Sequence, residues 1–446
     1  MKHSFSLLAA ALAFAAPIAV SAQALPALPT ITNSALTLKD ALRLATANNV
    51  TLKQSEADAQ IAAASARSVR AQSKPSVSAT TYGTAGDSSN ILTTSPAVLP
   101  QNIFSVPPHG FADQNLMLMV PLFTGGRLGQ GSEAANRQRE AADADRQAAG
   151  LTVTEAVTEG YVNALLQSAL VTVAQTRVTA EDEQVRETAE KVSAGRLAPV
   201  DLLREQAEQA DANQALLAAQ NNIQLALISL KTTLGVSQNS SIILADTLDA
   251  FTGTASARQP ATLTAALDEA GSARPEIAAA LRRVAAAGSA AKAAQGAYAP
   301  QIYGVAMADA SAGAGVGRTG YTVSLTASLP LYDGGQRRAE TDAAHSRLER
   351  AQADALQARQ AVDQQVATAW LTRETVQAQI PAASAGVTAA QQAYTLAELR
   401  YSAGKSVSAD RLAALLALTR AQGSLAQAKA SLLIAEARLA AALGKP

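Results

Sequence analysis

Few residues of this chain have the types and spacing that catalysis or metal binding requires. The 446 residues contain three histidines and no cysteine, which excludes thiol nucleophiles and Cys-containing zinc or iron–sulfur sites. His109 lies in a predicted loop and His345 in a predicted helix, and neither has a neighbouring ligand or triad partner. The glycine-rich run 313–317 is followed by no Lys-Ser or Lys-Thr pair, so it does not predict a phosphate loop. We therefore expect no enzymatic activity, no cofactor and no metal.

Two carboxylates recur in equivalent surroundings. Asp201 and Asp410 each lie six residues after the glycine of a Ser-Ala-Gly turn, Gly195 and Gly404. In one interpretation each carboxylate stabilises the first turn of the following helix, because an anion there complements the helix dipole. In the other, several copies of each aspartate surround a narrow pore as a carboxylate ring, which favours cations. The two roles are compatible.

The composition favours long helices over an enzyme fold. Lysine and arginine number 36, as do aspartate and glutamate, so the formal net charge is zero and a nucleic-acid partner is disfavoured. Aromatic residues make up 3%, and about a quarter of the residues are alanine, well above the usual share. Alanine has the highest helix propensity and a small side chain. We therefore expect long helices in close contact.

The first residues have the pattern of an export signal. Lys2 precedes an apolar run from Leu7 to Val20, which ends before the small residue Ala22. This pattern predicts a signal peptide over 1–22, cleaved near Ala22; the alternative is an N-terminal membrane anchor, for which the run is short. No other apolar stretch of about 18 residues occurs. The only candidate membrane-spanning elements of the mature chain are therefore β-strands.

The chain contains an internal duplication. The motif Val-Pro-Leu-Phe-Thr-Gly-Gly at 120–126 returns as Leu-Pro-Leu-Tyr-Asp-Gly-Gly at 329–335, an offset of 209 residues. The same offset relates the two Ser-Ala-Gly turns and the two aspartates. We predict an N-terminal segment 23–35, a first repeat 36–235, a mid-body linker 236–260 and a second repeat 261–444. Each unit is far longer than a solenoid repeat.

Each unit predicts the same order of elements: helix, strand, strand, long helix and return helix. Residues 39–73 have helical spacing, and Pro75 ends that helix. Apolar and small polar residues alternate over 321–329, which indicates a strand. Long helices are expected over 125–194 and 334–403, and leucines at seven-residue spacing predict coiled-coil return helices. We call the first helix of each unit its entry helix. A return helix and an entry helix stacked end to end would together match the length of one long helix. The linker would then lie midway along the body.

Only an oligomer completes this fold. Two units give four strands per chain, too few to close a barrel, and open strand edges in lipid must be paired. Two copies would give a barrel filled by its own side chains, whereas three give twelve strands and an open lumen. We therefore expect a homotrimer with outer-membrane lipid around its strands.

Together these features resemble the TolC-like outer-membrane efflux proteins. The resemblance covers 38–444 and rests on the Leu-Lys-Asp-Ala-Leu opening at 38–42, the two strand-to-helix junctions and the paired turns, above all 401–410. It implies a mainly α fold with a membrane β-barrel. A trimeric 12-stranded β-barrel in the outer membrane of a Gram-negative bacterium would continue as a long α-helical barrel through the periplasm. Without a cysteine, the chain is not expected to be lipid-anchored.

The resemblance also implies a periplasmic gate. In the family a tyrosine of the second turn region holds an aspartate of the first, and Tyr401 and Asp201 occupy these positions, with Asp410 as a further gate residue. The chain departs from the family pattern at Ser406, where an arginine is expected, and at Val200 and Ala413. Lys405 would partly substitute for that arginine.

The implied partners are a periplasmic adaptor and an inner-membrane pump of the RND, ABC or MFS type. We predict that the adaptor contacts the two turns, Gly195-Arg196-Leu197-Ala198-Pro199 and Gly404-Lys405-Ser406-Val407-Ser408. The implied function is the exit duct of a tripartite efflux or type I secretion system. The alternative is a periplasmic coiled-coil adaptor or a structural protein of an export complex, which the duplication and the alternating strands disfavour.

Overall fold

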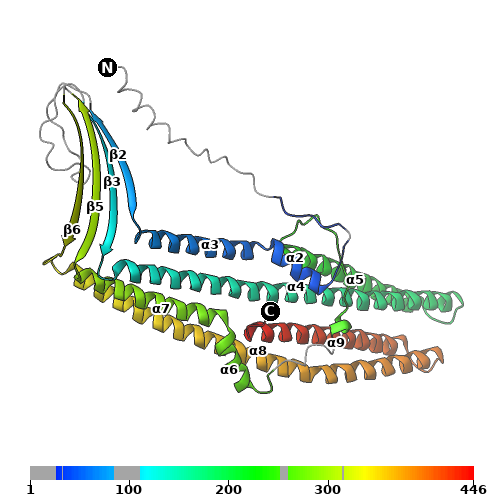
Figure 1. Ribbon diagram of the computed structural model, residues 1–446. Helices are drawn as coiled ribbons and strands as arrows, with labels where there is room; N and C mark the ends of the chain where they lie inside the picture. The colour runs from blue at the N-terminus through cyan, green and yellow to red at the C-terminus, as the bar shows by residue number, and fades with distance from the viewer. Residues whose placement is uncertain (1–26, 33, 85–110, 252–259, 314–315, 446) are drawn as a thin grey trace.

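The computed structural model describes residues 27–32, 34–84, 111–251, 260–313 and 316–445. The predicted signal peptide 1–22 and His109 lie outside these ranges. The chain is elongated, with a β-sheet at one end and two helical hairpin turns at the other (Figure 1). None of the helices in the described ranges contains a stretch long and apolar enough to cross a membrane.

The elements follow the predicted duplicated order. The first unit contains α2 (Leu38–Asn48), α3 (Val50–Ala71), β2 (Ser76–Thr84), β3 (Phe111–Phe123), α4 (Arg127–Ser193) and α5 (Pro199–Leu234). The second contains α6 (Leu263–Ala273), α7 (Pro275–Gln295), β5 (Gln301–Gly313), β6 (Val316–Ser328), α8 (Gln336–Ser402) and α9 (Ser408–Ala442). Short elements complete the chain: β1 (Ser34–Leu36), β4 (Ile242–Leu244) and the 3-10 turns η2 (Leu248–Phe251) and η4 (Gly296–Tyr298).

The predicted entry helix over 39–73 is two helices, α2 and α3. Asn49 separates them with extended backbone torsions, φ −58° and ψ 130°, and its side-chain oxygen accepts a hydrogen bond from the Leu52 amide at 3.2 Å. An asparagine side chain that caps a helix competes with continuation of the preceding helix. The chain therefore breaks at Asn49, although the apolar spacing continues across it. The second unit breaks at the corresponding place, where Pro275 begins α7.

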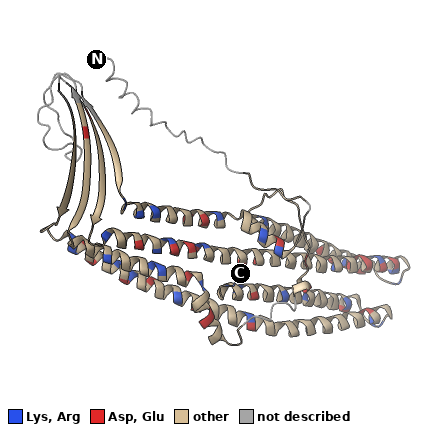
Figure 2. Cartoon of the chain, in the orientation of Figure 1, with Lys and Arg blue, Asp and Glu red and all other residues tan. Residues whose placement is uncertain are grey.

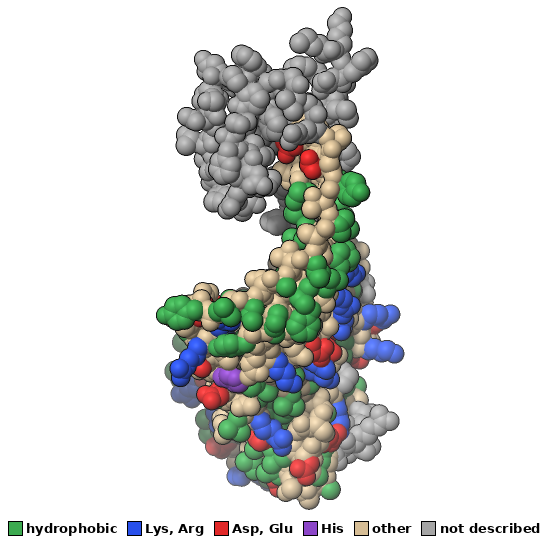
Figure 3. Space-filling model, turned by 60° about the vertical axis from the view of Figure 1, so that its left-hand side comes forward, with side chains coloured by type: hydrophobic (Ala, Val, Ile, Leu, Met, Phe, Trp, Pro, Cys, Tyr) green, Lys and Arg blue, Asp and Glu red, His purple; other side chains and the backbone are tan. Residues whose placement is uncertain are grey.

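The four long strands form one antiparallel sheet in the order β2-β3-β5-β6. Charged residues are rare in it: Asp113, Asp309 and Arg318 are the only ones on these strands. Figure 2 shows that charges are concentrated on the helices instead. In β6 the predicted alternation is confirmed, and its apolar members Tyr321 and Val323 are 84% and 76% exposed. Hydrophobic side chains gather along this part of the molecule (Figure 3).

The two long helices, α4 and α8, contain 67 residues each, or about 100 Å at the α-helical rise. Glycines with positive φ mark both their ends. Gly126 and Gly335 precede the helices, and Gly195 and Gly404 follow them at φ 73° and 70°. Because a left-handed backbone is costly for residues with a Cβ, these glycines fix where each long helix stops and the chain turns back.

Return and entry helices meet end to end at mid-body, as predicted. After α5, Gly235 lies so close to the α2–α3 break that a Cβ there would be 2.5 Å from the Asn48 carbonyl oxygen. Asn49 donates a hydrogen bond to the Thr233 carbonyl at 2.7 Å. At the corresponding place after α9, the buried Arg274 guanidinium donates to the Ala441 carbonyl at 2.6 Å. Each long helix is thereby flanked by a pair of shorter ones.

The main core lies at mid-body, where the linker crosses the helices. The parallel pair β1–β4 and the turn η2 pack on α4 around the buried Tyr161, Leu230 and Leu234. The Tyr161 hydroxyl lies 2.7 Å from the Leu36 carbonyl oxygen and 2.8 Å from the Asp246 carboxylate. This buried hydroxyl ties the linker to the long helix.

Candidate functional site

The candidate site is the end of the molecule opposite the sheet, where the α4–α5 and α8–α9 hairpins turn (Figure 1). Both turns close in the same way: the Arg196 amide donates to Lys191 O and the Lys405 amide to Arg400 O, each at 2.8 Å. Most side chains of the two predicted adaptor-contacting turns are exposed, and Leu197, Ser406 and Ser408 are half-buried. The turns therefore present an accessible surface built on identical backbone geometry.

The two predicted gate aspartates lie in the first turns of the return helices. Asp201 is in the first turn of α5, 3.8 Å from an Arg204 guanidinium nitrogen. Asp410 is in the first turn of α9 and accepts a hydrogen bond from the Ser406 hydroxyl at 2.6 Å. Both positions suit the interaction of an anion with the helix dipole. Pore lining by these aspartates stays a prediction, since it depends on the assembled ring.

Tyr401, the third predicted gate residue, lies between the two hairpins. Its hydroxyl accepts a hydrogen bond from the Gln184 side-chain amide at 3.2 Å. The Lys191 ammonium lies 4.4 Å from the ring centroid and the Arg411 guanidinium 5.5 Å from it, which are cation–π distances. Tyr401 is thus bound to α4 and α9 within the chain, and its predicted contact with Asp201 stays a prediction.

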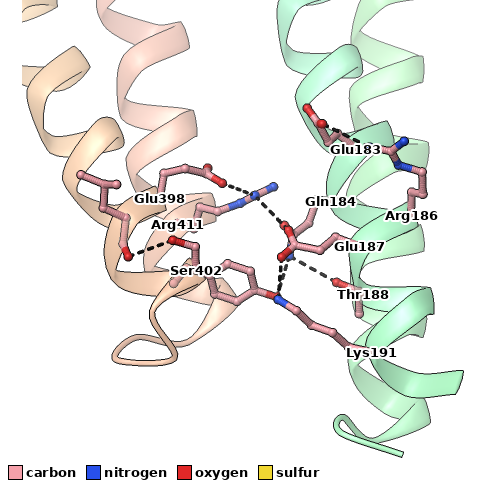
Figure 4. A network of polar contacts seen from close by, with 11 residues as sticks. Glu183, Gln184, Arg186, Glu187, Thr188, Lys191, Glu398, Ser402 and Arg411 are labelled. Carbon is pink, nitrogen blue, oxygen red and sulfur yellow. Dashed lines mark hydrogen bonds and ion pairs between the residues drawn. The ribbon is translucent and has the colours of Figure 1, made fainter. Parts of the chain in front are cut away.

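Arg411 is the central cation of this cluster (Figure 4). It is 5% exposed and forms an ion pair with Glu398 at 2.9 Å and a longer one with Glu187 at 4.0 Å. Glu187 also pairs with Lys191 at 2.6 Å. Because Arg411 comes from α9, Glu398 from α8 and Glu187 from α4, the cluster joins the two hairpins.

A second set of buried polar groups adjoins Arg411. Glu181 and Glu205 face each other across the first hairpin and are 2% and 4% exposed. Burial, reinforced by the Glu205 carboxylate, raises the pKa of Glu181, whereas the charges of Arg177 and Arg411 lower it. One carboxylate oxygen of Glu181 has no hydrogen-bond partner among the residues that the structure describes. The described residues contain no group of three or more histidine, aspartate or glutamate side chains suited to holding a metal ion.

Sequence reasoning missed most of this network, although the duplication contained a signal. We call the residues Gln184, Glu187, Lys191, Glu398, Tyr401 and Arg411 the hairpin network. At the offset of 209, Arg411 corresponds to Leu202 and Tyr401 to Val192. A charged or polar residue in one unit at a position that is apolar in the other indicates an asymmetric contact.

Other chemistry-bearing residues lie apart from this end. His345 is exposed, and its Nε2 lies 3.1 Å from the Gln295 amide nitrogen. Gln295 is the one hydrogen-bond partner of this ring among the described residues.

The sequence matches the family model of the outer membrane efflux protein over residues 41–236 and 266–445. Comparison with curated proteins gives no match. Among solved structures, the fold is similar to that of CusC, with a TM-score of 0.77, 20% identity and coverage of 96% of each chain.

The fold is also similar to those of two outer membrane channels. The outer membrane channel CmeC of Campylobacter jejuni has a TM-score of 0.75 at 18% identity, covering 93% of this chain and 89% of that one. The open state of the outer membrane channel MtrE of Neisseria gonorrhoeae has a TM-score of 0.73 at 23% identity, covering 92% and 89%. At these identities the similarity concerns the fold.

Proposed function

Because this chain belongs to the outer membrane efflux protein family, we propose that three copies form the exit duct of a tripartite efflux or type I secretion system. The predicted resemblance, the outer-membrane location and the fold class are confirmed. Proteins of this family and fold are channels rather than enzymes. What is proposed is the assembly, its partners and its route of export.

One observation carries the proposal: the sheet and the hairpin turns lie at opposite ends of the same long helices. The sheet ends in two edge strands, β2 and β6, and such edges require partners. Each chain contributes four strands, so three copies supply the twelve that were predicted. The helices then extend from the membrane into the periplasm, with the hairpin turns at the far end.

The exposed face of β6 supports a lipid contact. Tyr321, Val323 and Leu325 are between 69% and 84% exposed in one chain, and a contiguous apolar surface of this kind indicates a membrane or protein interface. Their alternation with Thr322 and Ser324 gives the second face small polar side chains, as suits a wet interior. Outer-membrane lipid would contact the apolar face.

The exposed turns support docking of a periplasmic adaptor, which would connect the duct to an inner-membrane pump. Lys405 and Val407 are exposed at the second turn, as are Arg196 and Pro199 at the first. Loops held by rigid elements are common binding sites. An RND, ABC or MFS pump would be compatible with this arrangement, and the pump would determine the exported substrate.

The alternative, an adaptor or purely structural coiled-coil protein, does not account for the properties of the sheet. Neither role requires a duplicated sheet whose outward face is apolar and whose edges are unpaired. The family match covers both repeats, which also favours the duct.

Fractionation and mass measurement test the assembly. We expect the protein in the outer-membrane fraction and, after detergent extraction, a protein mass near three chains. A soluble monomer would contradict the proposed duct.

Thiol crosslinking tests adaptor docking, because the chain has no cysteine of its own. A Lys405→Cys variant should crosslink to a co-expressed adaptor. The matched control is Tyr332→Cys, 90% exposed at the sheet end, which should not crosslink. Crosslinking from position 332 alone would contradict docking at the turns.

A further inference from the structure

The methionines of this chain are gathered in one part of the sheet. The sequence contains four, of which Met1 belongs to the predicted signal peptide. The other three are Met117 and Met119 on β3 and Met307 on β5. These two strands are neighbours at the centre of the sheet (Figure 1). Every methionine beyond the predicted signal peptide therefore lies on a single strand pair.

The strand register places the three methionines on the same face of the sheet. Met117 is directly opposite Met307, which in turn is opposite Thr322 of β6. Met119 lies two residues from Met117 and so shares its face. The exposed Tyr321, which we assign to the lipid-facing side, belongs to the other face, because side chains alternate along a strand. The methionines thus lie on the small polar face, which the proposed duct turns toward its wet interior.

Methionine is unusual on this polar face. At the offset of 209, Met117 and Met119 correspond to Thr326 and Ser328 of β6, so the second repeat has small hydroxyl side chains at these positions. Contact with lipid does not account for the methionines, since lipid would lie against the opposite face. All three are half-buried in one chain, so part of each side chain is open to the polar side. The thioether sulfur is the group that methionine adds there.

The spacing of the methionines allows them to share one ion. Directly opposite residues on antiparallel strands have Cβ atoms about 4.5–5.5 Å apart, and residues two apart along a strand are separated by about 7 Å. A methionine side chain is unbranched and has three rotatable bonds. The sulfur atoms of Met117 and Met307 can therefore converge on one ion, with Met119 as a third ligand. Thioethers select soft cations such as Cu⁺, whereas Mg²⁺ and Ca²⁺ prefer oxygen ligands.

Carboxylates on the same face favour the approach of a cation. Asp309 of β5 is opposite Asn115 of β3, in the row of residues next to the methionine pair. Asp113 lies two residues further along β3. The one basic residue of the four long strands, Arg318, is opposite Ser311 and so lies one row beyond Asp309. Because charges of one sign raise the local concentration of the opposite ion, this face combines attraction for cations with soft ligands.

We propose that Met117, Met119 and Met307 form a binding site for a soft monovalent cation, Cu⁺ or Ag⁺. All the ligands come from one chain, and only the position of the site on the inner wall of a duct rests on the proposed function. The expectation of no metal was based on histidine and cysteine, which are ligands of a different class. The cation is a solute that passes the site, and no resident cofactor is implied.

Silver binding to the purified protein tests the site, because the chain has no cysteine whose thiol would compete. His109 and His345 are replaced by glutamine in every sample, so that imidazole does not contribute. Isothermal titration with Ag⁺ should show a saturable site that excess Mg²⁺ does not displace. The double variant Met117→Leu/Met307→Leu keeps the side-chain volume and should lose this site.

The control is Asp309→Asn, which removes the nearest carboxylate and leaves the thioethers in place. It should weaken the binding of Ag⁺ but keep the saturable site. Saturable binding that survives the double methionine substitution, or that is abolished by Asp309→Asn alone, would overturn the proposal.

Oxidation gives a second readout that a general loss of structure would not reproduce. Hydrogen peroxide oxidises a methionine thioether to the sulfoxide and is itself reduced to water, and the peptide gains one oxygen atom. Bound Ag⁺ should slow this reaction at Met117 and Met307, as measured by peptide mass, whereas Mg²⁺ should not. Oxidation at the same rate with and without Ag⁺, or no oxidation in its absence, would contradict an accessible thioether site.

The two proposals fail on different observations. A soluble monomer would contradict the duct, yet loss of Ag⁺ binding on substitution of the methionines would still support the site, because its ligands come from one chain. If the protein is a trimer in the outer membrane and the methionine substitutions leave Ag⁺ binding unchanged, the duct stands and the site is wrong.

Discussion

The two hairpins have the same turns but different interiors. Gly195 and Gly404 take nearly the same left-handed φ, and the hydrogen bonds that close the two turns have equal lengths. A few residues deeper, Glu181 and Glu205 are buried in the first hairpin, where the second has Ala390 and Ala414. The duplication thus keeps the residues that set the path of the backbone. It differs at buried positions, where side chains of the two hairpins pack against other helices.

The largest effect should come from removing the central cation of the hairpin network. Arg411→Leu introduces the residue that stands at the equivalent position, Leu202. It leaves Glu398 and Glu187, which are 39% and 35% exposed, without their buried partner, and the lost hydrogen bond from Arg411 to Glu398 alone costs about 1.5–3 kcal/mol. Thermal unfolding of the detergent-solubilised protein should show a marked loss of stability.

The control for that variant is Leu202→Ala. It should cause a much smaller loss of stability, because Leu202 is only half-buried within a single chain. Equal destabilisation by the two substitutions would remove the distinction between the two hairpins.

Glycine substitutions compare the turns with the mid-body junction. Gly195→Ala and Gly235→Ala both force an alanine into positive φ, at a cost of about 1–2 kcal/mol each. At Gly195 the described part of the chain places no atom within 4 Å of the new Cβ, whereas at Gly235 the Asn48 carbonyl oxygen lies at 2.5 Å. Because of this overpacking, the unfolding free energy of Gly235→Ala should be lower than that of Gly195→Ala by about 1–3 kcal/mol. Similar losses at both positions would contradict the tight junction.

The next smaller effect concerns the predicted gate. Tyr401→Phe removes the hydrogen bond from Gln184 but keeps the ring close to Lys191 and Arg411. The free energy of unfolding should therefore fall by about 0.5–1.5 kcal/mol. We expect an increased leak current in planar bilayers, and the same for Asp201→Ala if the predicted latch forms in the trimer. Unchanged closed-state conductance in both variants would contradict a gate at these residues.

The smallest effect is a pH dependence specific to the first hairpin. Because the folded state raises the pKa of Glu181 above its ordinary value, the folded state binds the proton more tightly than the unfolded chain does. Its stabilising contribution is therefore complete below the ordinary glutamate pKa and is lost as the pH rises through the raised one.

Glu181→Gln removes this titration, so the difference in stability between the variant and the parent protein should grow in favour of the variant over that pH range. Comparing the two proteins cancels other titrating groups. A difference that does not change with pH would contradict the raised pKa.

Much of the fold could be predicted because local patterns encode it. The alternation in β6, the glycines around α4 and α8, and the offset of 209 each specify an element by its own residues. The break at Asn49 was missed, because apolar spacing continues across it and only the side-chain cap reveals it.

The hairpin network could not be predicted from local patterns. Gln184 and Tyr401 are 217 residues apart, and whether Arg411 points into a seam or into solvent depends on how the hairpins pack. Asp201, Asp410 and the two turns were found through the duplication, and their predicted gate and adaptor roles came from the resemblance to a family. Where this chain departs from the family pattern, the contacts of its residues can be identified only in the structure.

The most direct test of the account is the size of the product when a Gln214→Cys/Gln379→Cys protein is bridged with a short bis-maleimide in outer membranes and separated under denaturing conditions. At the offset of 209 these positions correspond to Gly423 on α9 and Leu170 on α4, where a Cβ at Gly423 would lie 3.6 Å from the Leu170 side chain of the same chain. A closed ring of three chains, each joined by α8 to the α5 of the next, predicts covalent species of up to three chains and no larger. Bridged protein that migrates only as single chains, or as an open ladder beyond three, would contradict the trimeric duct.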